Sequence, residues 1–111
     1  MSGLLDAMYW LMTCRHRRDR LQLREQHRAA HREHVATGGG GLATVLIGSA
    51  LTDDDGEAPI GNFGVLEAPT REAAQAFAEN DPFARAGIVE SIEIVALPSR
   101  FPAQRIKPPP G

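Results

Sequence analysis

The stretch Leu42-Ala-Thr-Val-Leu-Ile-Gly-Ser-Ala-Leu51 is followed, after Asp53-Asp-Asp-Gly56, by Ile60-Gly-Asn-Phe-Gly-Val-Leu-Glu-Ala68. Both outer stretches are apolar and partly β-branched, which is typical of β-strands. The acidic stretch between them ends in glycine and is closely followed by Pro59, a composition that favours a turn. We therefore expect two antiparallel strands joined as a hairpin in the middle of the chain.

A helix is expected on each side of this hairpin. Asp19 is a candidate N-cap for a helix that runs to Ala36, and the glycines at 38–41 are expected to end it in the left-handed conformation. On the other side, apolar residues at i, i+3, i+4 spacing predict a helix over 71–79. Pro82 ends that helix, because proline disfavours a helical conformation at the residue before it.

Two further apolar segments complete the pattern. Residues 7–14 contain two aromatic side chains and no Gly or Pro, and residues 88–97 alternate apolar with polar side chains, so both are expected to be strands. The resulting order β-α-β-β-α-β predicts an α+β, ferredoxin-like fold, with two helices on one face of a four-stranded antiparallel sheet. The other face would stay apolar and uncovered, which predicts a homodimer with the two sheets packed face to face.

Length and composition fit one small domain. The 111 residues include 42% hydrophobic side chains, enough for a single core. We expect a domain over residues 7–97, an N-terminal extension at 1–6 and a proline-rich tail at 98–111 that is extended or disordered. The single cysteine excludes an internal disulfide, and no apolar run reaches the length of a membrane span, so we expect a cytoplasmic protein without membrane contact.

The basic residues are concentrated in one segment. Residues 15–34 carry seven arginines against three acidic side chains, a local charge of +4 in a chain of net charge −2. Such a segment can bind nucleic-acid phosphates, but it lacks interleaved aromatic side chains and the rest of the chain is acidic. We therefore favour a solvated helix face and expect no nucleic-acid partner.

Three histidines lie on the first predicted helix. His27, His31 and His34 are spaced by four and three residues, so they share one helical face. Two histidines four residues apart can bind zinc, but the sequence offers no cysteine pair and no catalytic glutamate in the required pattern. We expect no metal ion.

Cys14 and Ser49 each have a functional and a structural interpretation. The neighbouring Arg15 can lower the pKa of a thiol, but without a second cysteine a core position is favoured for Cys14. Ser49 follows Gly48 within an apolar strand and lacks the context of a nucleophile elbow, which favours a hydroxyl that lines a pocket.

Asp81 is the most informative polar residue. It lies at the predicted end of a helix, where the helix dipole disfavours a carboxylate, which predicts a cationic or histidine partner. A histidine from the other helix would form a His–Asp pair able to support general acid–base chemistry. The alternative is that Asp81 only ends the helix.

Six segments of the chain carry a resemblance to a known family. They are Met8-Tyr-Trp-Leu-Met-Thr-Cys14, Arg28-Ala-Ala-His31, Ile47-Gly-Ser49, Gly61-Asn-Phe-Gly-Val-Leu-Glu67, Glu72-Ala-Ala-Gln75 and Asp81-Pro-Phe-Ala-Arg-Ala-Gly-Ile-Val-Glu90. Together they resemble the YCII-related (YciI-like) family over residues 7–97. The chain departs from the family pattern at residues 15–18, where Arg-His-Arg-Arg replaces the usual Asp and Gly.

This resemblance implies a ferredoxin-like subunit of a dimeric α/β barrel. It implies that His31 and Asp81 form an active-site dyad, that Arg28 is the family's arginine and that Ser49 lies near the same pocket. One member of the family is a dehydrochlorinase that acts on a chlorinated hydroxyhydroquinone.

Two functions follow as hypotheses. The first is a cofactor-independent lyase or isomerase that acts on a small phenolic or lactone-type substrate, with His31 and Asp81 catalytic and Arg28 and Ser49 binding the substrate. The alternative is a non-catalytic dimeric protein that binds a small molecule or has an accessory role. The first requires that His31 and Asp81 meet in a cavity open to solvent.

Overall fold

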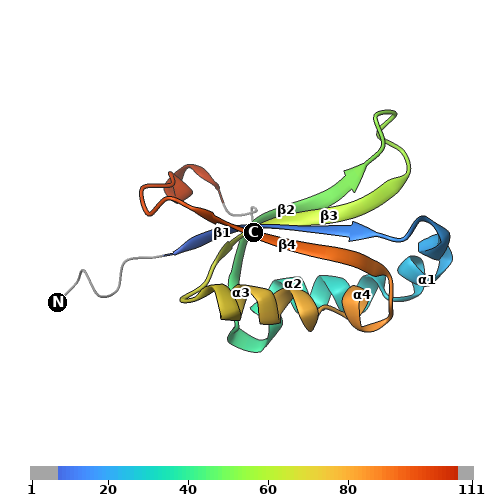
Figure 1. Cartoon of the computed structure of the whole chain (residues 1–111), viewed down its shortest axis with the longest axis horizontal. Coiled ribbons are helices and arrows are strands. Elements are labelled where there is room, and N and C mark those ends of the chain that lie inside the picture. The colour runs from blue at the N-terminus through green and yellow to red at the C-terminus, as the bar shows by residue number, and fades with distance from the viewer. Residues whose placement is uncertain (1–7, 108–111) are drawn as a thin grey trace.

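The computed structural model describes residues 8–107, and its four strands form one antiparallel sheet (Figure 1). The strands are β1 (Tyr9–His16), β2 (Thr44–Thr52), β3 (Pro59–Glu67) and β4 (Val89–Leu97), in the spatial order β2-β3-β1-β4. The helices α1 (Leu21–Gln26), α2 (Arg28–Gly41), α3 (Arg71–Glu79) and α4 (Pro82–Arg85) lie on one side of this sheet. The ferredoxin-like α+β fold expected from the sequence is confirmed.

The central hairpin of β2 and β3 is formed as predicted. Asp53 and Ala58 close its loop with a backbone hydrogen bond of 3.1 Å, and the N–H of Gly56, at φ +74°, donates to the carbonyl of Asp53. The guanidinium of Arg18 donates two hydrogen bonds, of 2.8 and 3.2 Å, to the carboxylate of Asp53. The arginine-rich connection after β1 is therefore tied to the hairpin loop.

The first predicted helix is wrong in two respects. Asp19 caps no helix, because it lies inside a short 3-10 helix (Arg18–Arg20), and the helical segment that follows is broken at His27 (φ −105°, ψ 7°) into α1 and α2. Strand β1 continues through Arg15 and His16, two residues beyond its expected end, because both residues pair with β4. This extension leaves Asp19 in the connection instead of at the start of the helix.

The glycine run ends α2 as expected. Gly38, Gly39 and Gly40 have φ values of +63°, +66° and +79°, a left-handed turn that residues with a side chain rarely adopt. The carbonyl of Gly38 accepts hydrogen bonds from the N–H groups of Leu42 and Ala43. A Cβ atom at Gly38 would lie 1.8 Å from the carbonyl oxygen of Ala43, so this position also requires glycine for space.

Helix α3 matches the predicted range, and the segment after it differs from the prediction. Thr70 caps α3 by accepting a hydrogen bond from the Ala73 N–H, and the apolar stripe of Ala74, Phe77 and Ala78 is buried. The chain then forms the short helix α4, where only a connection was expected. Asp81 caps α4 with its side chain, so the residue belongs to the start of this helix as well as to the end of α3.

The core lies between the sheet and the helices. Alternate side chains of β1 point toward the helices, and Trp10, Met12 and Cys14 are buried there together with Leu66 and Phe77. The indole N–H of Trp10 donates to the carbonyl of Ala68 at 3.1 Å, which satisfies its polar atom inside this apolar layer.

The opposite face of the sheet carries an aliphatic row. The strand register aligns Ile47, Val65, Leu11 and Val95 across β2, β3, β1 and β4. Ile47 and Val95 are 48% and 44% exposed, so both ends of this row are open to solvent.

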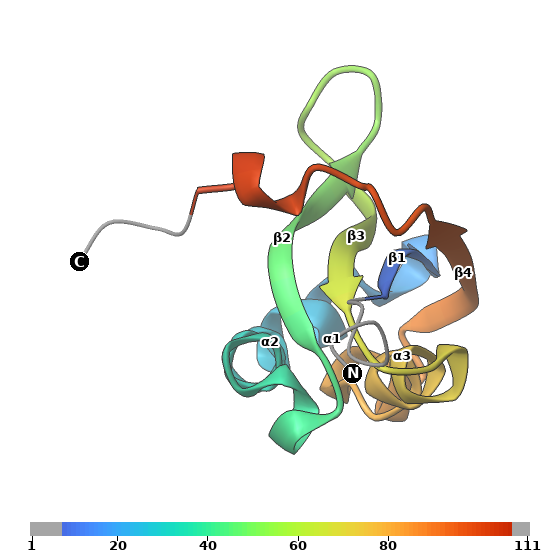
Figure 2. The same cartoon turned by 90° about the vertical axis from the view of Figure 1, so that its left-hand side faces the viewer.

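The segment after β4 turns back across this face, as Figure 2 shows. The rings of Phe101 and Tyr9 lie 5.5 Å apart, and Ala103–Arg105 form a short 3-10 helix. The expectation of an extended or disordered tail is therefore wrong for this part. The expected N-terminal extension at 1–6 and the last four residues lie outside the described residues. No helix within residues 8–107 has the length and apolar character needed to cross a membrane.

The glycine turn allows a matched test of stability. Gly38→Ala and Gly40→Ala both place a side chain at positive φ, which costs about 1–2 kcal/mol per residue. Only the Gly38 substitution adds the clash with Ala43, since nothing lies within 4 Å of a Cβ at Gly40. We expect urea denaturation to show a clearly larger loss of unfolding free energy for Gly38→Ala. Equal losses would contradict this explanation.

Candidate active site

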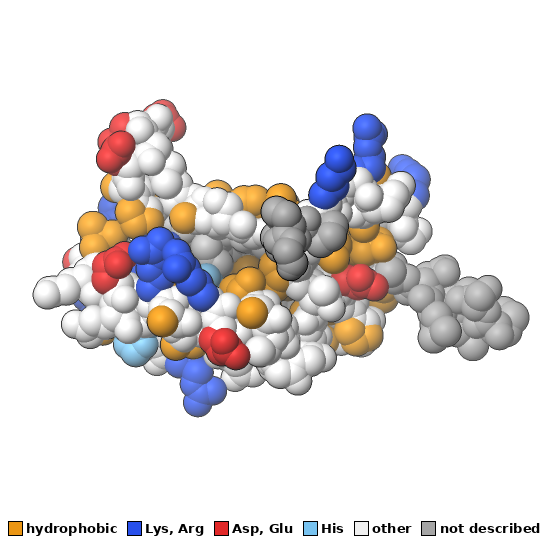
Figure 3. All heavy atoms as spheres, turned by 180° about the vertical axis from the view of Figure 1, so that it is seen from behind, with side chains coloured by type: hydrophobic (Ala, Val, Ile, Leu, Met, Phe, Trp, Pro, Cys, Tyr) orange, Lys and Arg blue, Asp and Glu red, His pale blue; other side chains and the backbone are white. Residues whose placement is uncertain are grey.

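A pocket of about 380 Å³ opens between α2 and the edge strand β2. This volume is within the range of small-molecule sites. Figure 3 shows the hollow on the face behind that of Figure 1, with arginine side chains at its rim. The lining comes from every layer of the fold and comprises Met12, Arg24, Arg28, His31, Arg32, Val35, Val45, Gly48, Ser49, Ala50, Asn62, Phe63, Gly64, Phe77, Asp81 and Phe83.

His31 and Asp81 form a hydrogen-bonded pair in this pocket. Nδ1 of His31 lies 2.9 and 2.8 Å from the two carboxylate oxygens of Asp81, and the side chains are 16% and 5% exposed. An ionised carboxylate only accepts hydrogen bonds, so Nδ1 carries the proton and donates it. Nε2 is then the ring nitrogen that remains for a ligand.

Two contacts to Phe83 fix this pair in place. The backbone N–H of Phe83 donates to Oδ1 of Asp81 at 2.8 Å, and the Phe83 ring stacks on the His31 imidazole with centroids 4.1 Å apart and planes 9° apart. A partner for Asp81 is expected from the sequence because a carboxylate is disfavoured at a helix C-terminus. The structure adds a favourable reason for the position, since Asp81 is also the N-cap of α4.

Arginines give the pocket a positive rim. Arg24, Arg28 and Arg32 line it from α1 and α2 at four-residue intervals. The guanidinium of Arg24 lies 5.1 Å from the centre of the Phe83 ring, and its buried Nε has no hydrogen-bond partner within residues 8–107. Burial lowers the pKa of Arg24, but arginine stays charged. The prediction that the arginines form a solvated helix face is therefore correct for only part of the cluster.

The sheet side of the pocket is built from small residues. Gly48 on β2 pairs with Gly64 on β3, and Ala50 pairs with Asn62 two positions along. A Cβ at Gly64 would lie 3.3 Å from both Leu66 and Met12, so this part of the floor is already close-packed around the glycine. Gly48 and Gly64 both line the pocket, so neither of these two positions projects a side chain into it.

Ser49 is the predicted site residue that stands apart from the others. It belongs to the pocket lining, but its hydroxyl donates to the carbonyl of Ala50 at 3.0 Å. The register pairs it with Phe63, and because side chains alternate along a strand, both belong to the face opposite the helices. Arg28, His31 and Asp81, by contrast, converge on the pocket.

The three helix histidines have separate environments. Nε2 of His34 donates to the carbonyl of Phe77 at 2.8 Å, His31 faces Asp81, and His27 lies at the break between α1 and α2. Within residues 8–107 no three His, Cys, Asp or Glu side chains are arranged to hold a metal ion.

Two buried groups border the pocket on β1. Burial, with a smaller contribution from the nearby Asp81 carboxylate, raises the pKa of the Cys14 thiol to about 12, so the thiol stays protonated in the core. Burial also lowers the pKa of His16, which is 3% exposed and whose Nε2 lies 2.7 Å from Oδ1 of Asn62. The core interpretation of Cys14 is confirmed.

Several pocket residues were not predicted from the sequence. The spacing of Arg24, Arg28 and Arg32 was a signal, because residues four apart share a helix face. Glycine within a strand signals a close approach of backbone or ligand, and this could have identified Gly64. Nothing local marks Asn62, whose role depends on the strand register.

The fold and site define a small ferredoxin-like domain with a cationic pocket around a His–Asp pair. The chain belongs to the YCII-related domain family, whose sequence profile matches residues 8–98. No curated protein matches the chain in a sequence search.

Two solved structures are similar to this fold. One is 5-chloro-2-hydroxyhydroquinone dehydrochlorinase from Burkholderia phenoliruptrix AC1100 in complex with 2,5-dihydroxybenzoquinone, which is 26% identical, with a TM-score of 0.66 over 78% of this chain and 90% of that one. The other, a Bacteriodes thetaiotaomicron VPI-5482 protein assigned to the antibiotic biosynthesis monooxygenases, is 16% identical, with a TM-score of 0.52 over 86% of this chain and 91% of that one. The second likeness concerns the fold alone.

Burial of His16 predicts an acid-dependent loss of stability. Its pKa is lowered in the folded chain, so below the ordinary value of 6.5 the unfolded chain binds a proton that the folded chain does not. This contribution to stability is present at neutral pH and is lost progressively as the pH falls below 6.5 toward the lower pKa of the folded chain. The free energy of unfolding, measured by urea denaturation, should fall less between pH 7.5 and pH 5.0 for His16→Gln than for the unsubstituted chain. His27→Gln is the control and should lose as much as the unsubstituted chain; identical losses in all three would refute this assignment.

Proposed function

We propose that this chain is a cofactor-independent lyase- or isomerase-type enzyme that moves a proton on a small phenolic or hydroxyquinone substrate. The observation that carries the proposal is the His31–Asp81 pair, in which Nδ1 is bound to the carboxylate and Nε2 is left for a ligand in a cationic pocket. In this assignment His31 is the general acid–base, Asp81 orients it, and Arg28 binds a substrate oxygen.

The chemistry follows from the tautomer of His31. With its proton on Nδ1, the imidazole has a lone pair on Nε2 that can take a proton from a substrate hydroxyl. The resulting imidazolium is stabilised by the Asp81 carboxylate, and stacking on Phe83 restricts rotation of the ring. A positioned acid–base group of this kind contributes on the order of 10²–10⁴-fold to the rate.

The arginines support an anionic substrate or transition state. Arg28 lies one helical turn from His31 in the same pocket, and Arg24 presents a partly buried charge. A phenolate or enolate oxygen placed between them would receive charge-assisted hydrogen bonds. Charge that develops on oxygen as the proton leaves would therefore be stabilised.

The dehydrochlorinase relative supports a specific test reaction. Net loss of HCl from a chlorinated hydroxyhydroquinone converts two ring hydroxyls into the two carbonyls of a hydroxyquinone. One hydroxyl proton moves to the carbon that bears the chlorine, and the second is lost as chloride leaves that carbon with the electron pair of its bond. Nε2 of His31 would take the first proton from oxygen and return it to this carbon, and would then accept the second, while the chloride goes to solvent. The overall reaction needs no oxidant or reductant.

The test is chloride release from 5-chloro-2-hydroxyhydroquinone. We expect kcat to fall on the order of 10²–10⁴-fold in His31→Asn, because the proton acceptor is removed, and to fall also in Asp81→Asn, in which the imidazole loses its carboxylate partner. Arg28→Gln should mainly raise KM.

The matched control is His27→Asn, a substitution outside the pocket lining that should leave turnover unchanged. If the unsubstituted chain binds hydroxyquinones without releasing chloride, or if His31→Asn retains full turnover, the enzymatic proposal fails. Binding without turnover would favour a non-catalytic ligand-binding protein.

We also propose that the functional unit is a homodimer with the uncovered sheet faces packed together. The row of Ile47, Val65, Leu11 and Val95 spans all four strands and is open at both ends. An apolar row of this extent is stabilised when a second sheet covers it. The same face in a second copy offers a complementary aliphatic surface.

Light scattering during size-exclusion chromatography tests the dimer. The unsubstituted chain should elute with twice the mass of one chain, and Val95→Asp should shift it toward a single chain, because a charge would be buried between the sheets. Ala36→Glu, on the exposed surface of α2, should remain dimeric. A single-chain mass for the unsubstituted protein would overturn the proposal.

A further inference from the structure

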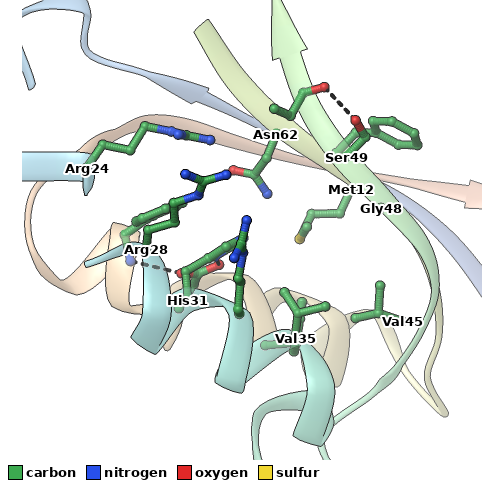
Figure 4. Close-up of a pocket in the computed structure, with 16 residues that line it drawn as sticks. Met12, Arg24, Arg28, His31, Val35, Val45, Gly48, Ser49 and Asn62 are labelled. Carbon is green, nitrogen blue, oxygen red and sulfur yellow. Dashed lines mark hydrogen bonds and ion pairs between the residues drawn. The ribbon is translucent and has the colours of Figure 1, made fainter. Parts of the chain in front are cut away.

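Asn62 is a buried amide with one half of its hydrogen-bonding capacity unused. It lies on β3 opposite Cys14 of β1 and Ala50 of β2, on the helix side of the sheet, and is 5% exposed. Its Oδ1 lies 2.7 Å from Nε2 of His16. Figure 4 shows its side chain pointing from the strand into the pocket, across from His31.

His16 fixes which end of the amide faces the pocket. The buried imidazole is neutral and so carries one N–H, and because Oδ1 only accepts, that proton lies on Nε2. The buried Nδ1 then keeps an unused lone pair. The reversed amide would instead require a buried Nδ1–H without an acceptor, which is the rarer and costlier arrangement. Nδ2 is therefore the end directed at the pocket.

We propose that Asn62 is a specificity-determining residue, whose Nδ2 donates a hydrogen bond to an oxygen of the ligand bound beside His31. Within residues 8–107 Nδ2 has no hydrogen-bond partner, although Asn62 is only 5% exposed. Nδ2 is not sealed in the core but is reached from the pocket, so a ligand oxygen placed there can accept its hydrogen bond.

The surroundings of Asn62 define the ligand. Hydrogen-bond donors lie on both sides of the pocket, since Arg28 and Arg32 come from α2 and Asn62 from the sheet, and Nε2 of His31 is an acceptor in the same lining. Such a pocket matches a small planar ring with oxygens at two edges and one acidic hydroxyl. This choice of hydroxyquinones and phenolates rests on the proposed function, whereas the donor role of Asn62 does not require turnover.

The test is calorimetric titration with 2,5-dihydroxybenzoquinone. We expect Asn62→Leu, which removes the donor at similar volume, to weaken binding roughly 10- to 100-fold, the effect of losing a hydrogen bond to a charged oxygen. Asn80→Leu is the matched control, because Asn80 is exposed and lies outside the pocket lining, and should bind as the unsubstituted chain does.

A second measurement needs no variant of the pocket. The chain has only two asparagines, so the side-chain NH₂ signals of Asn62 and Asn80 can be told apart in a ¹⁵N spectrum by use of Asn80→Leu. On addition of the quinone, the Asn62 NH₂ protons should move downfield and those of Asn80 should stay in place. This readout keeps the proposal testable even if Asn62→Leu fails to fold.

The outcomes separate this proposal from the enzymatic one. A quinone that shifts the His31 ring signals but leaves the Asn62 NH₂ unmoved would overturn the donor role, whatever the turnover. Binding that depends on Asn62 without chloride release would support the donor role and refute the enzyme. Failure of the unsubstituted chain to bind the quinone would overturn this proposal, because the pocket would then not accept the ligand class it names.

Discussion

A buried carboxylate shared between two helices holds the site together. Asp81, 4% exposed, accepts hydrogen bonds from the Phe83 backbone N–H and from Nδ1 of His31. A buried charge is tolerated only when it is hydrogen-bonded or paired, so the position of α4, which Asp81 caps, is coupled to that of α2, which carries His31. The same geometry sets the position of the Phe83 ring, because the turn capped by Asp81 places this ring parallel to the His31 imidazole. The guanidinium of Arg24 also lies over the Phe83 ring.

The pocket exists because the sheet lacks bulk where the helices leave a gap. Beneath α3 the interior is filled by Trp10, Leu66 and Phe77, and close packing leaves no room there. Beneath α2 the paired Gly48 and Gly64 line the pocket and project no side chain into it. The interior between the sheet and the helices is thus a packed core beneath α3 and a pocket beneath α2.

The helices cover only one face of the sheet, so the apolar side chains of the other face have to be buried by something else. The segment after β4 lies across part of it, through the contact of Phe101 with Tyr9, and still leaves Ile47 and Val95 nearly half exposed. The face therefore retains apolar surface whose burial would stabilise a second layer. In this fold the site and the proposed subunit contact lie on opposite faces of one sheet, and Ser49, on the edge strand, belongs by its register to the second face.

Local patterns in the sequence determined the hairpin, the range of α3 and the glycine stop of α2, because turn chemistry and helical periodicity act over a few residues. They also indicated that Asp81 needs a partner, and the family resemblance pointed to His31, fifty residues away. The break at His27, the helix α4 and the extension of β1 to His16 depend on distant contacts and were not predicted. Only the tertiary structure decided that Arg24 and Asn62 join the His–Asp pair. The reason is physical: which way a strand residue faces, and which helix lies over it, are set by long-range pairing of β1 with β3 and β4, and no local pattern encodes that register.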